Sequence, residues 1–249
     1  ADGCTEFWFY GADGQNAINS TLPDSSEKSR CIISDIRVLD KRTTPTAGWG
    51  IYLSNVDNRT LVEGCFVGSF PTGQIYIGAT TGAPDCIEVR NNWVYSDIPG
   101  AFGVYLYRIG NTATIDTLYA DVTDGVAVFV DGTSLDSSAI AIRNIKHELT
   151  NAVYSTAYAT VQVSGAYYGV LTIENVTQST VSGVGAGCDV VSFLGTANGR
   201  ARLSNITGGH QQVAGTAPYT VRALGTYPQT FTGPVINMQS GHNGRLVRQ

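Results

Sequence analysis

The chain has 249 residues, of which 14% are charged and 43% hydrophobic, and its formal net charge is −5. This composition is typical of a folded domain with one sizeable core and excludes a disordered chain. A mildly acidic chain lacks the basic surface that favours nucleic acid, and no apolar run approaches the roughly 18 residues of a membrane span. We therefore expect neither a nucleic-acid partner nor insertion into a membrane.

Cysteine is used in a way that excludes two common structural devices. An odd number of cysteines cannot form a fully paired disulfide set within one chain, and the absence of CxxC spacing excludes a zinc ribbon. We expect buried free thiols, because a free cysteine packs as a small hydrophobic side chain. The residues concerned are Cys4, Cys31, Cys65, Cys86 and Cys188.

Residues 1–30 form a predicted N-terminal segment that precedes the repeats. It contains an aromatic run from Phe7 to Tyr10, but no amphipathic pattern of a capping helix. A repeat structure without a cap leaves apolar stacks and strand edges bare at its end. A weak cap therefore favours an oligomer or a longer parent chain.

Residues 31–207 contain a short repeat, in which an aliphatic residue is followed by any residue and then by a polar or small one. Successive copies lie 26 to 31 residues apart when measured at the third position. A fixed period of this length is the signature of a stacked repeat architecture. The third positions are Asp35, Gly64, Asn91, Thr117, Asn144, Asn175 and Asn205.

A second repeat lies between the copies of the first and keeps the same period. In each copy an outward position alternates with aliphatic residues on both sides, as Tyr52 does between Ile51 and Leu53. Such alternation is typical of a β-strand with one buried face. The outward positions are Tyr52, Tyr76, Tyr105, Phe129 and Gln162.

These two repeats predict an all-β fold in which the chain winds as a parallel β-helix. A strand that returns to the same place about every 28 residues needs a coil of about three short strands and three bends. We expect about seven such coils, stacked so that equivalent residues form columns. Asn91, Asn144, Asn175 and Asn205 suit a bend, because asparagine tolerates left-handed backbone and its amide can bond the next asparagine in the stack.

The stretch VRNNWVY from Val89 to Tyr95, with its asparagine bend and its period, resembles the right-handed parallel β-helix of the pectate-lyase-like superfamily. Within that superfamily it is most similar to phage tailspikes and capsular depolymerases, whose N-terminal YGADG motif is similar to Tyr10–Gly14. The resemblance covers residues 33–207. It implies a bacterial surface polysaccharide as partner, a homotrimer, and a location in the virion tail or outside the cell. It does not imply one activity, because the fold carries lyases, hydrolases, epimerases and inert spikes.

Residues 208–249 differ in composition from the repeats. They contain glycine and proline, few aromatic residues, and arginines at the end of the chain. We expect this C-terminal region to leave the coil and to pack against neighbouring subunits.

Aligning the repeats places aromatic side chains together on one outward face of the predicted helix. Sugar rings have apolar C–H faces that stack on aromatic rings, so this face is a candidate polysaccharide-binding surface. The alternative is that these rings are covered by a loop or a subunit. The candidate substrate-binding residues are Phe66, Trp93, Tyr95, Tyr119 and Lys146.

The same face carries candidate catalytic acids. Cleavage of a glycosidic bond uses two carboxyl groups, one of them kept protonated as the acid. Asp121 and Glu148 would lie on adjacent coils, and their proximity would raise the pKa of one of them. Asp124 and Asp97 lie at the edges of the region and are the next candidates. In the alternative interpretation these acids are solvated surface and Lys146 simply neutralises Glu148.

A second outward column is purely aromatic over four coils and consists of Tyr52, Tyr76, Tyr105 and Phe129. A long apolar stripe is unusual on the surface of a monomer. It either binds sugar or is covered by another subunit, and we favour the subunit contact because tyrosine and phenylalanine are typical of interface cores.

The sequence therefore favours a tailspike-like protein that binds and depolymerises a surface polysaccharide through Asp121 and Glu148. One alternative is a non-enzymatic virion spike, adhesin or structural β-helix. Another is a secreted polysaccharide lyase, which would use a basic residue such as Arg37, Arg143 or Lys146. No nucleotide, zinc-protease or hydrolase motif is present, so we expect no cofactor and no metal site. His147 falls in the inward column and is expected to be a core residue.

Overall fold

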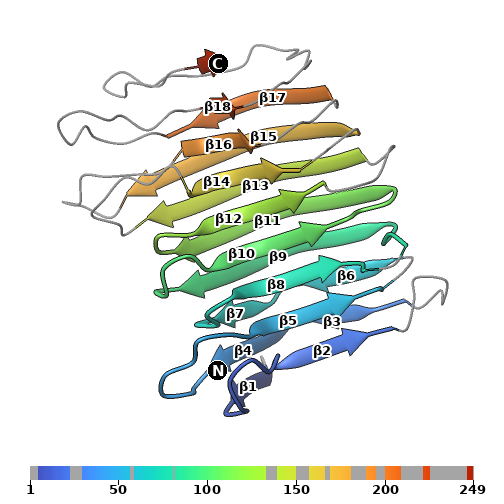
Figure 1. Ribbon diagram of the computed structural model, residues 1–249, viewed down its shortest axis with the longest axis vertical. Helices are drawn as coiled ribbons and strands as arrows, with labels where there is room; N and C mark the ends of the chain where they lie inside the picture. Colours follow the sequence, from blue (N-terminus) through green and yellow to red (C-terminus); the bar gives the residue numbers. More distant parts are fainter. Residues whose placement is uncertain are drawn as a thin grey trace.

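The computed structural model describes residues 5–22, 30–56, 59–80, 82–132, 139–149, 157–165, 169–180, 189–194, 200–208, 221–224 and 246–248. The chain forms a parallel β-solenoid of about six turns built from two parallel sheets. Figure 1 shows the strands stacked along the long axis, with the two ends of the chain at opposite ends of the stack. The part of the chain that the structure describes contains no helix able to cross a bilayer.

The first sheet contains the strand that carries the left-handed bend of each coil. Every neighbouring pair in it is parallel, and the register is continuous from one coil to the next. Its strands are β1 (Thr5–Phe9), β3 (Ile32–Ser34), β4 (Ile36–Asp40), β6 (Thr60–Glu63), β7 (Phe66–Gly68), β9 (Ile87–Ser96), β11 (Thr112–Val122), β13 (Ala139–Leu149), β15 (Val170–Thr180) and β17 (Arg200–Thr207).

The second sheet contains the strands of the second repeat and is also parallel throughout its described pairs. Its described strands run in the order β2, β5, β8, β10, β12, β14, β16, β18 and β19 along the stack. They are β2 (Ile18–Thr21), β5 (Trp49–Ser54), β8 (Gly73–Gly78), β10 (Phe102–Tyr107), β12 (Val126–Asp131), β14 (Ala159–Ser164), β16 (Asp189–Leu194), β18 (Val221–Leu224) and β19 (Leu246–Arg248).

The bends lie where the first repeat predicts them. All seven third positions have a left-handed backbone, with φ between 52° and 63°. The asparagine amides form a ladder across the coils, in which Asn144 donates to Asp116 at 2.7 Å, Asn175 to Asn144 at 3.0 Å, and Asn205 to Asn175 at 2.8 Å. The predicted asparagine stack is therefore confirmed from Asn144 to Asn205, whereas the amide of Asn91 lies 3.5 Å from the carboxylate of Glu63 instead.

The predicted number of strands in each coil requires a correction. We expected three short strands and about seven coils, whereas the structure has two sheets and about six turns. The reason is visible at Asn91, where the strand turns without losing its pairing, so that Ile87–Ser96 is one long bent strand. Only in the first coils does the bend divide the strand, at Asp35 between β3 and β4 and at Gly64 between β6 and β7.

The core is made of stacked aliphatic columns from both sheets. In the second sheet Ile51, Ile75, Val104 and Val128 are aligned in register, and each is fully buried. In the first sheet the inward column runs through Val38, Val67, Val94 and Ala120. Because like residues stack on like, each coil buries its apolar side chains against the next.

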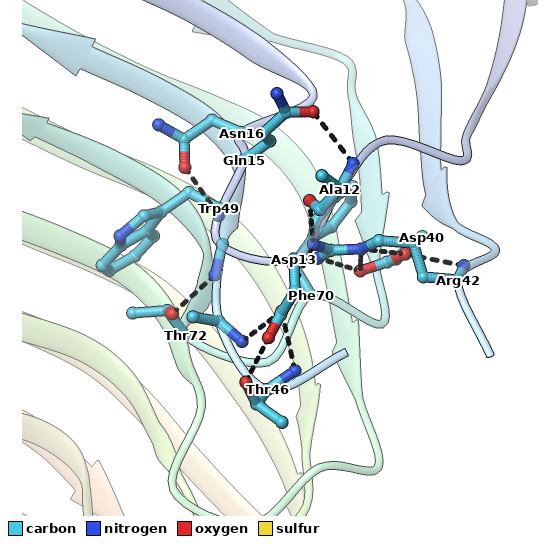
Figure 2. A network of polar contacts seen from close by, with 12 residues as sticks. Ala12, Asp13, Gln15, Asn16, Asp40, Arg42, Thr46, Trp49, Phe70 and Thr72 are labelled. Carbon is cyan, nitrogen blue, oxygen red and sulfur yellow. Dashed lines mark hydrogen bonds and ion pairs between the residues drawn. The ribbon is translucent and has the colours of Figure 1, made fainter. Parts of the chain in front are cut away.

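The first coil is held by a network of charged and polar groups around the YGADG segment (Figure 2). The Asp13 carboxylate accepts hydrogen bonds from the hydroxyl of Thr46 and from the backbone N–H groups of Thr46 and Ala47, which hold its pKa well below the ordinary value. Arg42 binds both carboxylate oxygens of the buried Asp40 and donates to the carbonyl of Ala12 at 3.0 Å. This network fixes the loop after β1 to the loop after β4.

One polar column interrupts the apolar core. His147 is fully buried; its Nε2 lies 3.2 Å from the carbonyl of Val122 and its Nδ1 2.9 Å from the hydroxyl of Thr160. Gln178, the next residue in the column, donates to the same hydroxyl at 3.0 Å. The neutral imidazole satisfies this chain if Nε2 donates and Nδ1 accepts. The prediction that His147 is a core residue is confirmed.

The asparagine ladder generates a stability prediction. Asn175→Ala loses the ladder bonds and places a β-carbon in a left-handed backbone, so it should lower the free energy of unfolding by about 1 to 2 kcal/mol. Asn175→Gly loses the same bonds but tolerates the backbone, and should cost less. Urea denaturation followed by circular dichroism compares the two. Equal losses for alanine and glycine would contradict the conformational part of the argument.

The buried histidine generates a prediction about pH. Burial lowers the pKa of His147 from 6.5 to about 4, so the unfolded chain binds a proton that the folded chain does not. Stability should therefore fall as pH falls from 6.5 towards 4, by roughly 3 kcal/mol for this group. His147→Gln, which cannot be protonated, should remove that part of the pH dependence. If the free energy of unfolding of wild type and of His147→Gln falls equally over this pH range, the prediction is wrong.

Candidate functional site

The outward columns of the first sheet are aligned as the sequence predicts. Trp93 of β9 pairs with Tyr119 of β11, which pairs with Lys146 of β13. Two residues further along the same strands, Tyr95 pairs with Asp121 and Asp121 with Glu148. We call the resulting surface the acid–aromatic face, and its members are Phe66, Trp93, Tyr95, Asp97, Tyr119, Asp121, Lys146 and Glu148.

The aromatic part of this face is a ladder of rings that ends in a cation on both sides. The Arg37 guanidinium lies over the ring of Phe66 at 4.7 Å, and the Lys146 ammonium lies over the ring of Tyr119 at 4.9 Å. Trp93 lies between them, with ring centroids 5.2 Å from Phe66 and 5.1 Å from Tyr119 and interplanar angles of 68° and 82°. A ring edge-on to both neighbours has no stacked partner in the ladder. Trp93 is also 48% exposed, so it offers a ring surface to a ligand.

The Glu148 carboxylate is held by two neighbours on the same face. Tyr119 donates a hydrogen bond to Oε2, and the Lys146 ammonium lies 3.0 Å from Oε1. The bond from Tyr119 and then the contact with Lys146 lower the pKa of Glu148, although partial burial opposes them. Glu148 is therefore ionised at neutral pH. Burial and the bond to Glu148 raise the pKa of Tyr119, so the phenol stays a hydrogen-bond donor.

Asp121 experiences the opposite effect. Partial burial, followed by the negative charges of Glu148 and Asp97, raises its pKa above the ordinary value. Asp121 and Glu148 are register partners on adjacent parallel strands, so their backbones are about 4.8 Å apart. Two neighbouring carboxyl groups whose pKa values shift in opposite directions are the arrangement that acid–base catalysis uses.

The remaining two predicted acids differ in their relation to this pair. Asp97 follows β9 and is exposed, and its charge contributes to the raised pKa of both Tyr95 and Asp121. Asp124 lies in the turn between β11 and β12 with φ of 46°, and burial alone raises its pKa. The structure therefore associates Asp97 with Asp121 and leaves Asp124 at the corner of the coil.

Sequence reasoning missed the bond between Tyr119 and Glu148. It compared residues within one column, whereas these two belong to adjacent columns on neighbouring strands. The i, j+2 offset between paired strands is a signal that finds such contacts, because long side chains reach across it.

The aromatic column of the second sheet is more extensive than predicted and less exposed. Tyr52 stacks on Tyr76 with centroids 4.5 Å apart, and Tyr105 lies 4.7 Å from Phe129. All four rings are half-buried rather than exposed, because they pack on one another and on two further aromatic residues. These are Trp49 and Phe102, each three residues before a tyrosine of the column, which is the signal that sequence reasoning overlooked.

We call the surface formed by Trp49, Tyr52, Tyr76, Phe102, Tyr105 and Phe129 the second-sheet aromatic face. Its edge is polar. The phenol of Tyr105 donates to the carboxylate of Asp131 at 3.0 Å. Burial and the charge of Asp131 raise the pKa of Tyr105. The face therefore combines apolar ring surface with a row of hydroxyl groups.

Across the described ranges, no three His, Cys, Asp or Glu side chains are grouped so that they could hold a metal ion. The residues of the acid–aromatic face could hold a sugar through ring stacking and carboxylate hydrogen bonds.

No protein-family model, curated protein or solved structure matches this chain.

Proposed function

We propose that the chain binds a bacterial surface polysaccharide on the acid–aromatic face and cleaves a glycosidic bond there. One observation carries this proposal, namely that Asp121 and Glu148 are register neighbours with opposite pKa shifts, beside the exposed ring of Trp93. Ring stacking would hold the sugar and the carboxyl pair would act on the bond.

In this reaction Asp121 is the general acid. Its pKa is raised above the ordinary value, which is the direction that a general acid requires, and as the acid it would give its proton to the oxygen of the leaving sugar. Glu148 stays ionised and supplies the second carboxylate, which acts either as base for a water molecule or as nucleophile at the anomeric carbon. The anomeric configuration of the first product, read by NMR, distinguishes these two roles.

The proposal includes a relationship to phage tailspikes, with a right-handed coil, a homotrimer and a place in the virion tail or outside the cell, where the protein would serve in attachment to the host. Parallel crossover connections are right-handed in almost all proteins, which supports the handedness. The half-buried rings of Tyr52, Tyr76, Tyr105 and Phe129 on the second sheet support a contact between subunits, since interface cores are rich in such residues.

A second candidate is a non-enzymatic spike that binds the polysaccharide without cutting it. The observation that favours it is that both oxygens of Glu148 are engaged, one by Tyr119 and one by Lys146. A carboxylate held in this way can have a purely structural role on the surface. Both candidates use Trp93 as the stacking ring, so only the fate of the polymer separates them.

Catalysis predicts that Glu148→Gln and Asp121→Asn each reduce cleavage at least about a hundredfold, because removal of a general acid or base costs that much. The measurement is the release of reducing ends from purified bacterial surface polysaccharides. Glu174→Gln is the matched control, because Glu174 also lies on the outer face of the first sheet and is also paired with a cation, Arg143 at 3.5 Å. The control should retain activity.

The result that contradicts catalysis by this pair is cleavage that survives both acid-to-amide changes in folded protein. A polysaccharide that binds in a Trp93-dependent manner but is never shortened supports the non-enzymatic spike.

The subunit contact predicts a trimer in solution, with a mass near three times 26.4 kDa by light scattering. Tyr76→Glu places a charge within the second-sheet aromatic face and should reduce the mass to that of the monomer. Thr177→Glu, an exposed position on the outer face of the first sheet, is the control and should leave the mass unchanged. A wild-type monomer would overturn the proposed trimer.

A further inference from the structure

The charges around Trp93 restrict the kind of sugar that the acid–aromatic face can hold. Three carboxyl groups belong to this face, those of Asp97, Asp121 and Glu148. They face a single cation of the same face, Lys146, whose ammonium is already 3.0 Å from Glu148. The negative charges of Glu148 and Asp97 both raise the pKa of Asp121, so the three acids are close enough to interact electrostatically.

Among the residues whose side chains the structure describes, four further arginines on the outer side of the first-sheet strands are either engaged by acids or lie further away. Arg37 is paired with Glu6 at 3.9 Å and lies over the ring of Phe66. Arg90 is held by Glu63 at 2.9 Å and by Glu88 at 3.4 Å, and Arg143 is held by Glu174 at 3.5 Å. Arg202 is on β17, two strands beyond the β13 strand that carries Glu148.

We infer that the glycan units bound on this face are uncharged, and that the face discriminates against sugars that carry a carboxylate, sulfate or phosphate. This inference rests on the proposed function and specifies its substrate class.

The physical reason is that an anionic sugar stacked on Trp93 would bring its charge next to the carboxylates of Glu148 and Asp97, while the cations described on this side of the sheet are already engaged or lie further away. Like charges at such separations repel, and the repulsion is greater where water is partly excluded. An uncharged sugar meets none of this repulsion, and its hydroxyl groups can donate hydrogen bonds to the same carboxylates. The acids that would repel a uronate thus become the groups that orient a neutral hexose.

The balance of acids and cations on this face also bears on whether the bond is cleaved by hydrolysis or by elimination. A polysaccharide lyase removes the proton next to the carboxylate of a uronic acid, so its site must neutralise that carboxylate with a cation. Lys146, the one cation among the members of the acid–aromatic face, is engaged by Glu148, and Arg37 at the other end of the ring ladder is engaged by Glu6. The charges on this face therefore suit hydrolysis of neutral units better than elimination from a uronic acid.

The experiment uses the whole chain and a panel of immobilised bacterial polysaccharides, half of them neutral and half uronate-containing. Binding of wild type and of Trp93→Ala is compared at low and at physiological ionic strength, because salt screens charge repulsion. A neutral polysaccharide that binds is then oxidised at its primary hydroxyls to uronate, and a portion is methyl-esterified to remove the new charge. The ester controls for the added bulk.

The expected result is Trp93-dependent binding of neutral polysaccharides, a loss of at least about tenfold on oxidation, and recovery on esterification. Trp93-dependent binding confined to uronate-containing polysaccharides, or unchanged by oxidation, would overturn the inference while leaving a polysaccharide site in place. Absence of any Trp93-dependent binding would overturn the proposed function itself.

Discussion

The structure depends on one constraint, which is that parallel strands of successive coils stay in register. In-register stacking forces each residue to lie on its equivalent in the next coil, so the sequence must supply like residues at a constant period. The aliphatic columns and the asparagine ladder both satisfy this condition. The left-handed bends allow it, because they turn the strand through a corner while its pairing continues on both sides.

Register also creates the candidate site. It brings Asp121 next to Glu148 although 26 residues lie between them in the sequence. Each acid also lies two residues along its strand from the column that contains Trp93. A column that stacked identical acids would accumulate repulsion. Here the neighbouring column supplies Tyr119 and Lys146, which hold one acid ionised, while burial and nearby charge favour the neutral form of the other. The chemical asymmetry thus comes from the adjacent column.

Much of this could be predicted from the sequence, because a strict period determines columns without knowledge of contacts. The bends at Asn91 and Asn144, the inward position of His147 and the pairing of Asp121 with Glu148 all follow from alignment of the repeats. Features that depend on side-chain length or on continuity through a bend could not be predicted. The bend at Asn91 does not divide its strand, so the predicted three strands in each coil are found only in the first coils. The tyrosine column is half-buried because Trp49 packs against it.

The most direct test of the account is an NMR titration of the side-chain carboxyl groups of Asp121 and Glu148, which needs no substrate. An aspartate ordinarily titrates below a glutamate, at 3.8 against 4.5. Here we expect Asp121 to titrate above its ordinary pKa and Glu148 below its own. If instead the pKa of Asp121 is not raised above 3.8, or that of Glu148 is not lowered below 4.5, the pair is not poised as acid and base, and these residues are surface charges on a solenoid.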